Sequence, residues 1–241
     1  MTRTDDEAAR THRTTGTHET TGARGATGTH QTAGAHETAG AREAAGAQEV
    51  AGLVLAAGGG RRLGGRPKAL LTHRGRPLVE HAVAVLRAAG CTRVHVVLGA
   101  RAGDVRERAR LADCVLVDNP AWEEGMGSSL RAGLGSLAGS PARAALVCLV
   151  DQPGIGAAAV GRVRSAFRDE TSLVAAAYEG VRGHPVLFGA AHWAGIAASA
   201  TGDRGARAYL KEHAAAITLV ECADVAQAYD IDTEADLAHL E

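Results

Sequence analysis

The chain lacks a dominant sign of charge, and it lacks any long run of apolar residues. Its 26 Lys and Arg residues nearly balance 27 Asp and Glu residues, which gives a formal net charge of −1. This balance gives no reason to expect nucleic acid as a partner, so any anion site must be local. No apolar stretch reaches the roughly 18 residues of a membrane span, and the polar N-terminus has no apolar signal region. We therefore expect a cytoplasmic protein that binds neither nucleic acid nor membrane.

Cysteine and aromatic residues are also few. The four cysteines are widely spaced, and no two of them form a Cys-x-x-Cys pair. Each lies in or beside an apolar stretch, which is typical of buried, reduced cysteines rather than of disulfides or a metal site. Aromatic residues make up only 3% of the chain, whereas hydrophobic residues reach 46%. A core can therefore form, but Val, Leu, Ile and Ala must fill it.

Residues 1–48 differ in composition from everything that follows. From Thr11 onward a six-residue unit recurs, and every unit ends in glycine. A hexapeptide period builds a β-helix only when each turn supplies an aliphatic residue, and up to residue 48 these units offer only Thr and Ala. We expect a disordered low-complexity tail, because the segment cannot bury enough apolar surface to offset its ordering entropy. The folded domain is then expected to span residues 49–241.

Beyond the tail, predicted strands alternate with predicted helices. The expected strands are 50–57, 93–98, 114–117, 144–150, 173–177, 185–188 and 217–220, with a short segment at 226–231. The expected helices are 77–89, 102–111, 128–137, 156–167, 190–198, 205–213 and one that begins at 233. The early strands are continuous apolar runs, as in parallel sheets that are covered on both faces. The pattern predicts an α/β fold whose ligand site lies at the carboxyl ends of the strands.

The most informative stretch is residues 55–68, LAAGGGRRLGGRPK, directly after the first predicted strand. Glycines let a backbone turn tightly and point several N–H groups at one anion. Arginine and lysine side chains beside such a nest supply the charge that a polyphosphate requires. This pattern favours a phosphate-binding loop over a solvated basic turn.

Two familiar phosphate loops fit this stretch poorly. Gly60 and Gly65 have the separation of a Walker A loop, but Arg and Pro follow where Lys and then Ser or Thr are required. Gly58 and Gly60 match the start of the dinucleotide fingerprint, but Leu63 stands at its third glycine. The Walker A interpretation is therefore rejected, and a hydride-transfer enzyme is only weakly supported.

A third pattern fits better. The loop, with Pro67-Lys68 after it, resembles the signature of the MobA-like NTP transferase family, and five further motifs follow in order. These are NPAWEEGMGSSLRAGL (119–134), VDQP (150–153), GHPVLF (183–188), GDRGAR (202–207) and DIDTEADL (230–237). The resemblance covers residues 50–241 and is closest to the molybdenum cofactor cytidylyltransferase branch, because the guanylyltransferase branch usually has an acid before the lysine. It implies a three-layer αβα, Rossmann-like nucleotidyltransferase fold with a mostly parallel, mixed sheet.

The resemblance also implies a reaction. It is transfer of a nucleoside monophosphate, CMP from CTP in the first instance, to a phosphorylated acceptor such as molybdopterin, with release of pyrophosphate. Such a reaction requires positioning and charge neutralisation more than covalent help. The implied catalytic residues are Arg62, Lys68 and Asp151. The implied nucleotide-binding residues are Leu55, Ala56, Ala57, Gly58, Gly59, Gly60, Arg62, Lys68, Gly125, Met126 and Ser128.

Mg²⁺ is the implied cofactor. Asp151 ends an apolar strand, where a carboxylate costs desolvation unless it is paired, metal-bound or caps the next helix. Magnesium prefers one or two carboxylates together with phosphate oxygens, and the resemblance makes Asp151 a metal ligand. Asp232, or Asp230 beside it, is the candidate for a second ligand. Asp232-Thr233 fits equally a cap of the last predicted helix, with Asp236 completing a capping box.

The second substrate is expected on the other side of the site. Gln152, Pro153 and His184 resemble the family's segments that face it, and Asp203, with the arginines after it, offers charge to an anionic substrate. Two alternatives stay open: an NAD(P)H-dependent oxidoreductase of the same family, and a non-catalytic accessory protein that carries a pterin cofactor. A molybdenum hydroxylase is the protein partner that the resemblance suggests.

Overall fold

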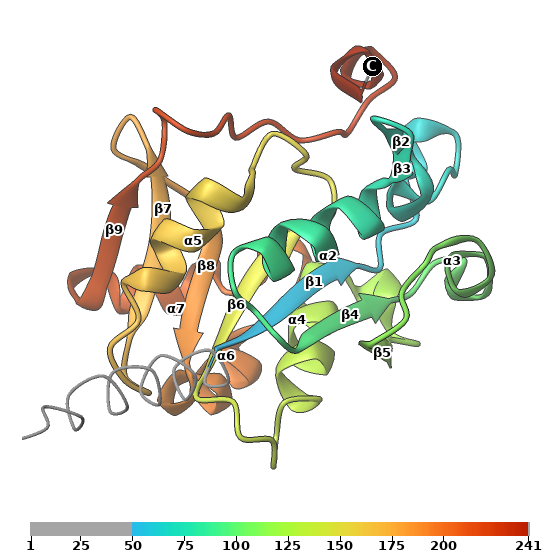
Figure 1. Ribbon diagram of the computed structural model, residues 1–241. Helices are drawn as coiled ribbons and strands as arrows, with labels where there is room; N and C mark the ends of the chain where they lie inside the picture. The colour runs from blue at the N-terminus through green and yellow to red at the C-terminus, as the bar shows by residue number, and fades with distance from the viewer. Residues whose placement is uncertain (1–49, 241) are drawn as a thin grey trace, which may run out of the picture.

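The computed structural model describes residues 50–240, so the tail predicted at 1–48 lies outside the described residues. Its centre is a seven-stranded sheet with the order β5-β4-β1-β6-β8-β7-β9 (Figure 1). The strands are β1 (Val50–Ala56), β4 (Val94–Leu98), β5 (Cys114–Asp118), β6 (Ala144–Leu149), β7 (Leu173–Tyr178), β8 (Val181–Gly189) and β9 (Ile217–Glu221). The helices are α2 (Leu78–Ala88), α3 (Ala102–Arg108), α4 (Met126–Gly135), α5 (Ala157–Ser165), α6 (Trp193–Ser199) and α7 (Arg207–Glu212).

The sheet is mixed but mostly parallel. β1 pairs in parallel with β4 and β6, β4 with β5, and β7 with β9. Only β8 runs antiparallel, against β6 on one side and β7 on the other. The α/β fold predicted from the alternating pattern, with the mostly parallel, mixed sheet that the resemblance implies, is therefore confirmed.

Helices cover both faces of this sheet. α2 and α5 lie on one face, while α4, α6 and α7 lie on the other (Figure 1). β1 is buried along its whole length because its alternate residues enter two different cores: Val50 and Val54 pack under α2 and α5, and Leu53 and Leu55 pack against the α4 side. This double burial explains why the strand is a continuous apolar run. None of the helices in residues 50–240 has the length and apolar character needed to traverse a bilayer.

The structure departs from the predicted elements most clearly in four places. β8 begins at Val181 rather than at 185, because its first half is polar and partly exposed and so carries no apolar signal. A small hairpin of β2 (Thr72–His73) and β3 (Arg76–Pro77) was not predicted, since two-residue strands leave no periodicity. The segment at 226–231 forms neither strand nor helix, and the last helix is a 3₁₀ helix, Ala235–Leu240.

The C-terminal residues return to the carboxyl ends of the central strands. After β9 the chain crosses one end of the molecule and reaches the β2–β3 hairpin, as the red segment in Figure 1 shows. Residues 226–232, here called the C-terminal strap, have no regular secondary structure. They run beside the loop that follows β6, so the strap becomes part of the edge where ligands bind in such sheets.

Candidate active site

The glycine loop, residues 57–66, leaves the end of β1 and folds back on itself. Gly60 has φ 60°, and its carbonyl accepts hydrogen bonds from Leu63 N and Gly65 N at 2.8 and 3.0 Å. A Cβ atom at Gly60 would overlap the carbonyl oxygen of Arg66. Both the left-handed backbone and the close approach therefore require glycine at this position.

The neighbouring glycines have different surroundings. Gly58 is exposed and a Cβ atom there would meet nothing within 4 Å. Gly59 lies against the indole ring of Trp122, whose nearest carbon would be 3.0 Å from a Cβ at this position. The loop is thus open to solvent at Gly58 and packed against the Trp122 ring at Gly59.

Lys68 lies between two carboxylates that come from distant parts of the chain. It begins a 3₁₀ helix, Lys68–Leu70, and its Nζ donates to Asp151 Oδ2 at 2.7 Å and also to Asp232 Oδ1. Asp151 follows β6 and Asp232 ends the C-terminal strap. The side chains of Lys68 and Asp151 are only 15% and 20% exposed, and that of Asp232 is 45% exposed.

The ammonium and the two carboxylates of this cluster stabilise each other's charged forms. Burial works against the Lys68 ammonium, but the Asp151 and Asp232 carboxylates outweigh burial and raise the pKa of Lys68 above its ordinary value. Arg62, which is largely exposed, approaches Asp232 at 4.0 Å. Gly60, Arg61, Arg62, Lys68, Asp203 and Asp232 together line a cavity of about 470 Å³. The structure therefore gathers the three predicted catalytic residues Arg62, Lys68 and Asp151 beside the glycine loop.

The two aspartates of the strap have different partners. Asp236 supplies its half of the predicted capping box, because its carboxylate accepts a hydrogen bond of 2.7 Å from Thr233 N, and it also accepts one of 3.0 Å from Asp232 N. The Asp232 side chain is thus left for Lys68. Asp230 accepts a hydrogen bond of 2.8 Å from Gln152 Nε2. Partial burial, with the nearby Asp151 and Asp232 carboxylates, raises the pKa of Asp230.

The donor set suits one hard divalent cation. Asp151 and Asp232 both reach the same ammonium, so their oxygens converge within the reach of a single ion. Within residues 50–240, no group of three or more His, Cys, Asp or Glu side chains is arranged to hold a metal. Two carboxylates without further protein ligands are what magnesium uses when phosphate oxygens complete its shell. The residues present therefore fit a metal ion that is shared with a polyphosphate.

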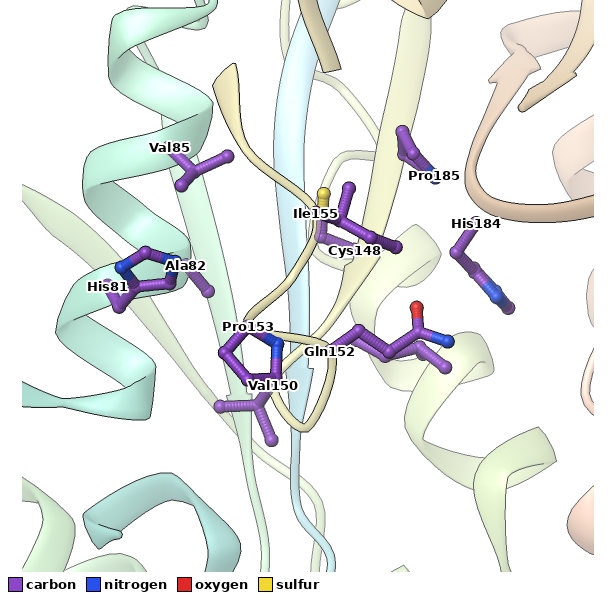
Figure 2. A pocket seen from close by; sticks show the side chains of 11 residues that line it. His81, Ala82, Val85, Cys148, Val150, Gln152, Pro153, Ile155, His184 and Pro185 are labelled. Carbon is purple, nitrogen blue, oxygen red and sulfur yellow. The ribbon is translucent and has the colours of Figure 1, made fainter. Parts of the chain in front are cut away.

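Gln152 and Pro153 lie in the Asp151 loop, and His184 lies on β8. They line a narrow cavity between α2 and β8, and Figure 2 shows Gln152 and His184 on the opposite side of the loop from His81. The cavity holds only about 10 Å³, roughly the space of one water molecule. Burial lowers the pKa of His184 to about 4, so its imidazole is neutral at pH 7. A substrate on this side must therefore bind over the rim of the cavity or open it.

The segment at the start of α4 is held tightly inside the protein. Ser128 is buried, and its hydroxyl donates to Gly125 O and accepts from Asn119 Nδ2, both at 2.8 Å. A Cβ atom at Gly125 would overlap Asp203, which lines the larger cavity. Gly125 and Met126 thus reach the cavity only through their packing against residues 202–205, and Ser128 does not line it. Asn119 was not singled out from the sequence, although its place directly after a strand and before Pro120 is a usable signal.

Comparisons with known proteins identify the family to which the chain is related. Residues 52–217 match the model of the MobA-like NTP transferase domain. The chain is 40% identical over 188 residues to Nicotine blue oxidoreductase of Paenarthrobacter nicotinovorans, covering 75% of this chain and 91% of that protein. It is 37% identical over 101 residues to Molybdenum cofactor guanylyltransferase of Acidiphilium cryptum, covering 42% of this chain and half of that protein.

Solved structures show the same fold. A homologue of Mycobacterium tuberculosis Rv0371c from Mycobacterium sp. strain JC1 superimposes with a TM-score of 0.70 at 30% identity, covering 80% of this chain and 97% of that one. Rv0371c of Mycobacterium tuberculosis in complex with manganese superimposes with a TM-score of 0.61 at 26% identity, with the same coverage. Since the family model spans well over half of the sequence, the chain belongs to the MobA-like NTP transferase family and is an enzyme of the nucleotidyltransferase type.

Proposed function

We propose that the protein transfers CMP from CTP to a phosphorylated small molecule such as molybdopterin, with Mg²⁺ as cofactor and pyrophosphate as the leaving product. One observation carries the proposal: Lys68 holds Asp151 and Asp232 together at the edge of the cavity that the glycine loop lines. Cationic side chains, backbone N–H groups and a carboxylate pair are the groups that a metal-bound triphosphate requires.

In this reaction a phosphate oxygen of the acceptor attacks the α-phosphorus of CTP. The bond from that phosphorus to the oxygen bridging the α- and β-phosphates breaks, and pyrophosphate leaves with the electron pair. The glycine loop would orient the triphosphate through its N–H groups, with Gly58 exposed to receive it. Arg62 and Lys68 would neutralise the charge that develops on the leaving pyrophosphate.

Asp151 and Asp232 would hold the metal. When bound, Mg²⁺ supplies positive charge to the phosphate oxygens during transfer. Lys68 must then exchange its two carboxylate partners for phosphate oxygens. Support for a divalent ion comes from the carboxylate pair itself and from the related mycobacterial protein that was solved with manganese.

The proposed nucleotide and acceptor each depend on one or two residues. Pro67 stands before Lys68, where the guanylyltransferase branch usually has an acid, so CTP is proposed rather than GTP. On the acceptor side, Gln152 Oε1 is buried and has no hydrogen-bond partner among the described residues, so it offers an acceptor to an N–H or O–H group. His184, neutral beside it, also suits an uncharged part of the acceptor. A cytoplasmic molybdenum hydroxylase would be the protein that uses the product.

A second candidate function is NAD(P)H-dependent reduction. Its support is the 40% identity to Nicotine blue oxidoreductase over most of both chains. The pyrophosphate of a dinucleotide would bind the same glycine loop, but a hydride transfer has no use for the Asp151–Lys68–Asp232 cluster.

Thermal shift measurements with CTP, GTP, ATP and NADPH, each with and without Mg²⁺, separate these functions. Stabilisation by CTP that depends on Mg²⁺ supports cytidylyl transfer, whereas stabilisation by NADPH alone supports the reductase and overturns our proposal. Incubation with CTP, Mg²⁺ and molybdopterin then distinguishes an enzyme from an accessory binder, because only the enzyme releases pyrophosphate.

A further inference from the structure

The C-terminal strap is attached to the loop that carries Asp151. Gln227 N donates to Gly154 O at 3.2 Å, and Ile231 N donates to Asp151 O at 2.9 Å. The two segments therefore run antiparallel, as a short two-bond ladder outside the main sheet. Ile231 is fully buried, so the strap is also anchored by its side chain.

Gly154 lies tightly against the strap. A Cβ atom there would overlap the carbonyl oxygen of Gln227 and would lie 2.5 Å from Cε1 of Tyr229. Real Cβ atoms do not approach other atoms this closely, so any side chain would push the strap away. The φ angle of Gly154 lies outside the left-handed region, so contact with the strap, rather than backbone conformation, is the reason for glycine.

The ladder sets the separation of the two carboxylates. Asp151 supplies the carbonyl that accepts from Ile231, and Asp232 is the next residue of the strap. Movement of the strap away from residue 154 would therefore carry Asp232 away from Asp151 and Lys68. Gly156, two residues further on, has nothing within 4 Å of its Cβ position, so the same substitution there disturbs no contact.

We propose that Gly154 is a positioning residue of the metal site, because the missing side chain lets the strap hold Asp232 beside Asp151. The proposal rests on the proposed function, since that function gives the carboxylate pair its metal. Gly154 itself does not line the cavity beside the glycine loop. Its effect passes through Asp232 alone, and this restricts what its substitution can change.

The test compares CTP affinity with and without Mn²⁺, measured by titration calorimetry, in wild type, Gly154→Ala, Gly156→Ala, Asp232→Asn and Gly154→Ala/Asp232→Asn. The ratio of the two affinities is the enhancement due to metal. We expect Gly154→Ala to lower this ratio at least tenfold and to leave metal-free CTP affinity within twofold. Gly156→Ala should change neither quantity.

The double variant identifies the route of the effect. If Gly154 acts through Asp232, Gly154→Ala should cause no further loss once Asp232 is Asn. The proposal is overturned if Gly154→Ala keeps the wild-type affinity ratio. It is also overturned if Gly154→Ala lowers this ratio equally in the wild-type and the Asp232→Asn backgrounds. If Gly154→Ala does not fold, Tyr229→Ala is used instead, because it loosens the strap without adding atoms. A metal enhancement ratio that falls less than threefold in Tyr229→Ala then overturns the proposal.

Amide hydrogen exchange separates this proposal from the proposed function. Exchange at Ile231 and Gln227 should be at least tenfold faster in Gly154→Ala than in wild type or Gly156→Ala. Unchanged exchange refutes the positioning role even if the enzyme uses metal. Faster exchange in a protein whose wild type shows no Mn²⁺ enhancement with CTP instead refutes the proposed function.

Discussion

Lys68 Nζ donates a hydrogen bond of 2.7 Å to Asp151 Oδ2, although 83 residues separate the two in sequence. The same ammonium also contacts Asp232, so one lysine compensates two carboxylates at the carboxyl end of β6. The Lys68 ammonium therefore lies between the two carboxylates, where the metal ion would lie when a metal-bound nucleotide is present. Metal binding and release of Lys68 are therefore coupled in our account.

Removal of the Lys68 charge should make stability depend on metal. Lys68→Met leaves Asp151 and Asp232 facing each other without compensation, and we expect it to lower the free energy of unfolding by about 1 to 3 kcal/mol at pH 7. Millimolar Mg²⁺ or Mn²⁺ without nucleotide should restore part of this loss. Denaturant unfolding with and without metal measures both effects. The matched control is Lys211→Met, the other lysine of the chain, which lies exposed on α7; an equal metal response in that variant would contradict the coupling.

Glycine substitutions within the loop should have unequal effects. Gly60→Ala strains a left-handed backbone and collides with Arg66 O, so we expect a loss of about 2 kcal/mol in unfolding free energy. CTP affinity should fall at least tenfold as the loop changes shape. Gly58→Ala meets open space and should stay within about 0.5 kcal/mol of wild type. Equal effects at the two positions, by thermal unfolding and calorimetry, would show that the loop is not shaped as described.

His184 should contribute to the acid sensitivity of the fold. Burial lowers its pKa to about 4, below the ordinary value of 6.5, so between these values the unfolded chain binds the extra proton. The stability due to neutral His184 is therefore complete above pH 6.5 and is lost as the pH falls towards 4, by about 3 kcal/mol. His184→Gln should reduce the loss of unfolding free energy between pH 7 and pH 4 by about this amount. Replacement of the exposed His239 serves as the control, and an unchanged pH dependence in His184→Gln would contradict the burial of this imidazole.

Most strands and helices could be predicted from local sequence, but the contacts between segments that are distant in the chain could not. The continuous apolar run of β1 predicts a buried parallel strand because both of its faces enter a core. The strap has no such pattern, since it is held by Ile231 and by backbone bonds to the Asp151 loop, which are long-range contacts. For the same reason the sequence left open whether Asp232 caps the last helix or serves the site, and in the structure its carboxylate contacts Lys68.

The residues of the candidate site could likewise be recognised in the sequence, but their contacts could not. Lys68 and Asp151 stand in motifs that can be recognised singly, but the bond between them depends on the order of β1 and β6 in the sheet. The tight packing of Ser128 with Asn119 was not predicted, because a buried serine and an exposed one look alike in a helix-opening motif.

Asp151→Asn gives the most direct test of our central claim that Asp151 is a metal ligand in nucleotidyl transfer. Pyrophosphate release from CTP with Mg²⁺ and molybdopterin would be measured for wild type and for the Asp151→Asn variant, with circular dichroism to confirm that the variant is folded. We predict that wild type turns over and that Asp151→Asn loses at least a hundredfold in rate while it keeps its fold. Comparable turnover in a folded Asp151→Asn variant would contradict the account.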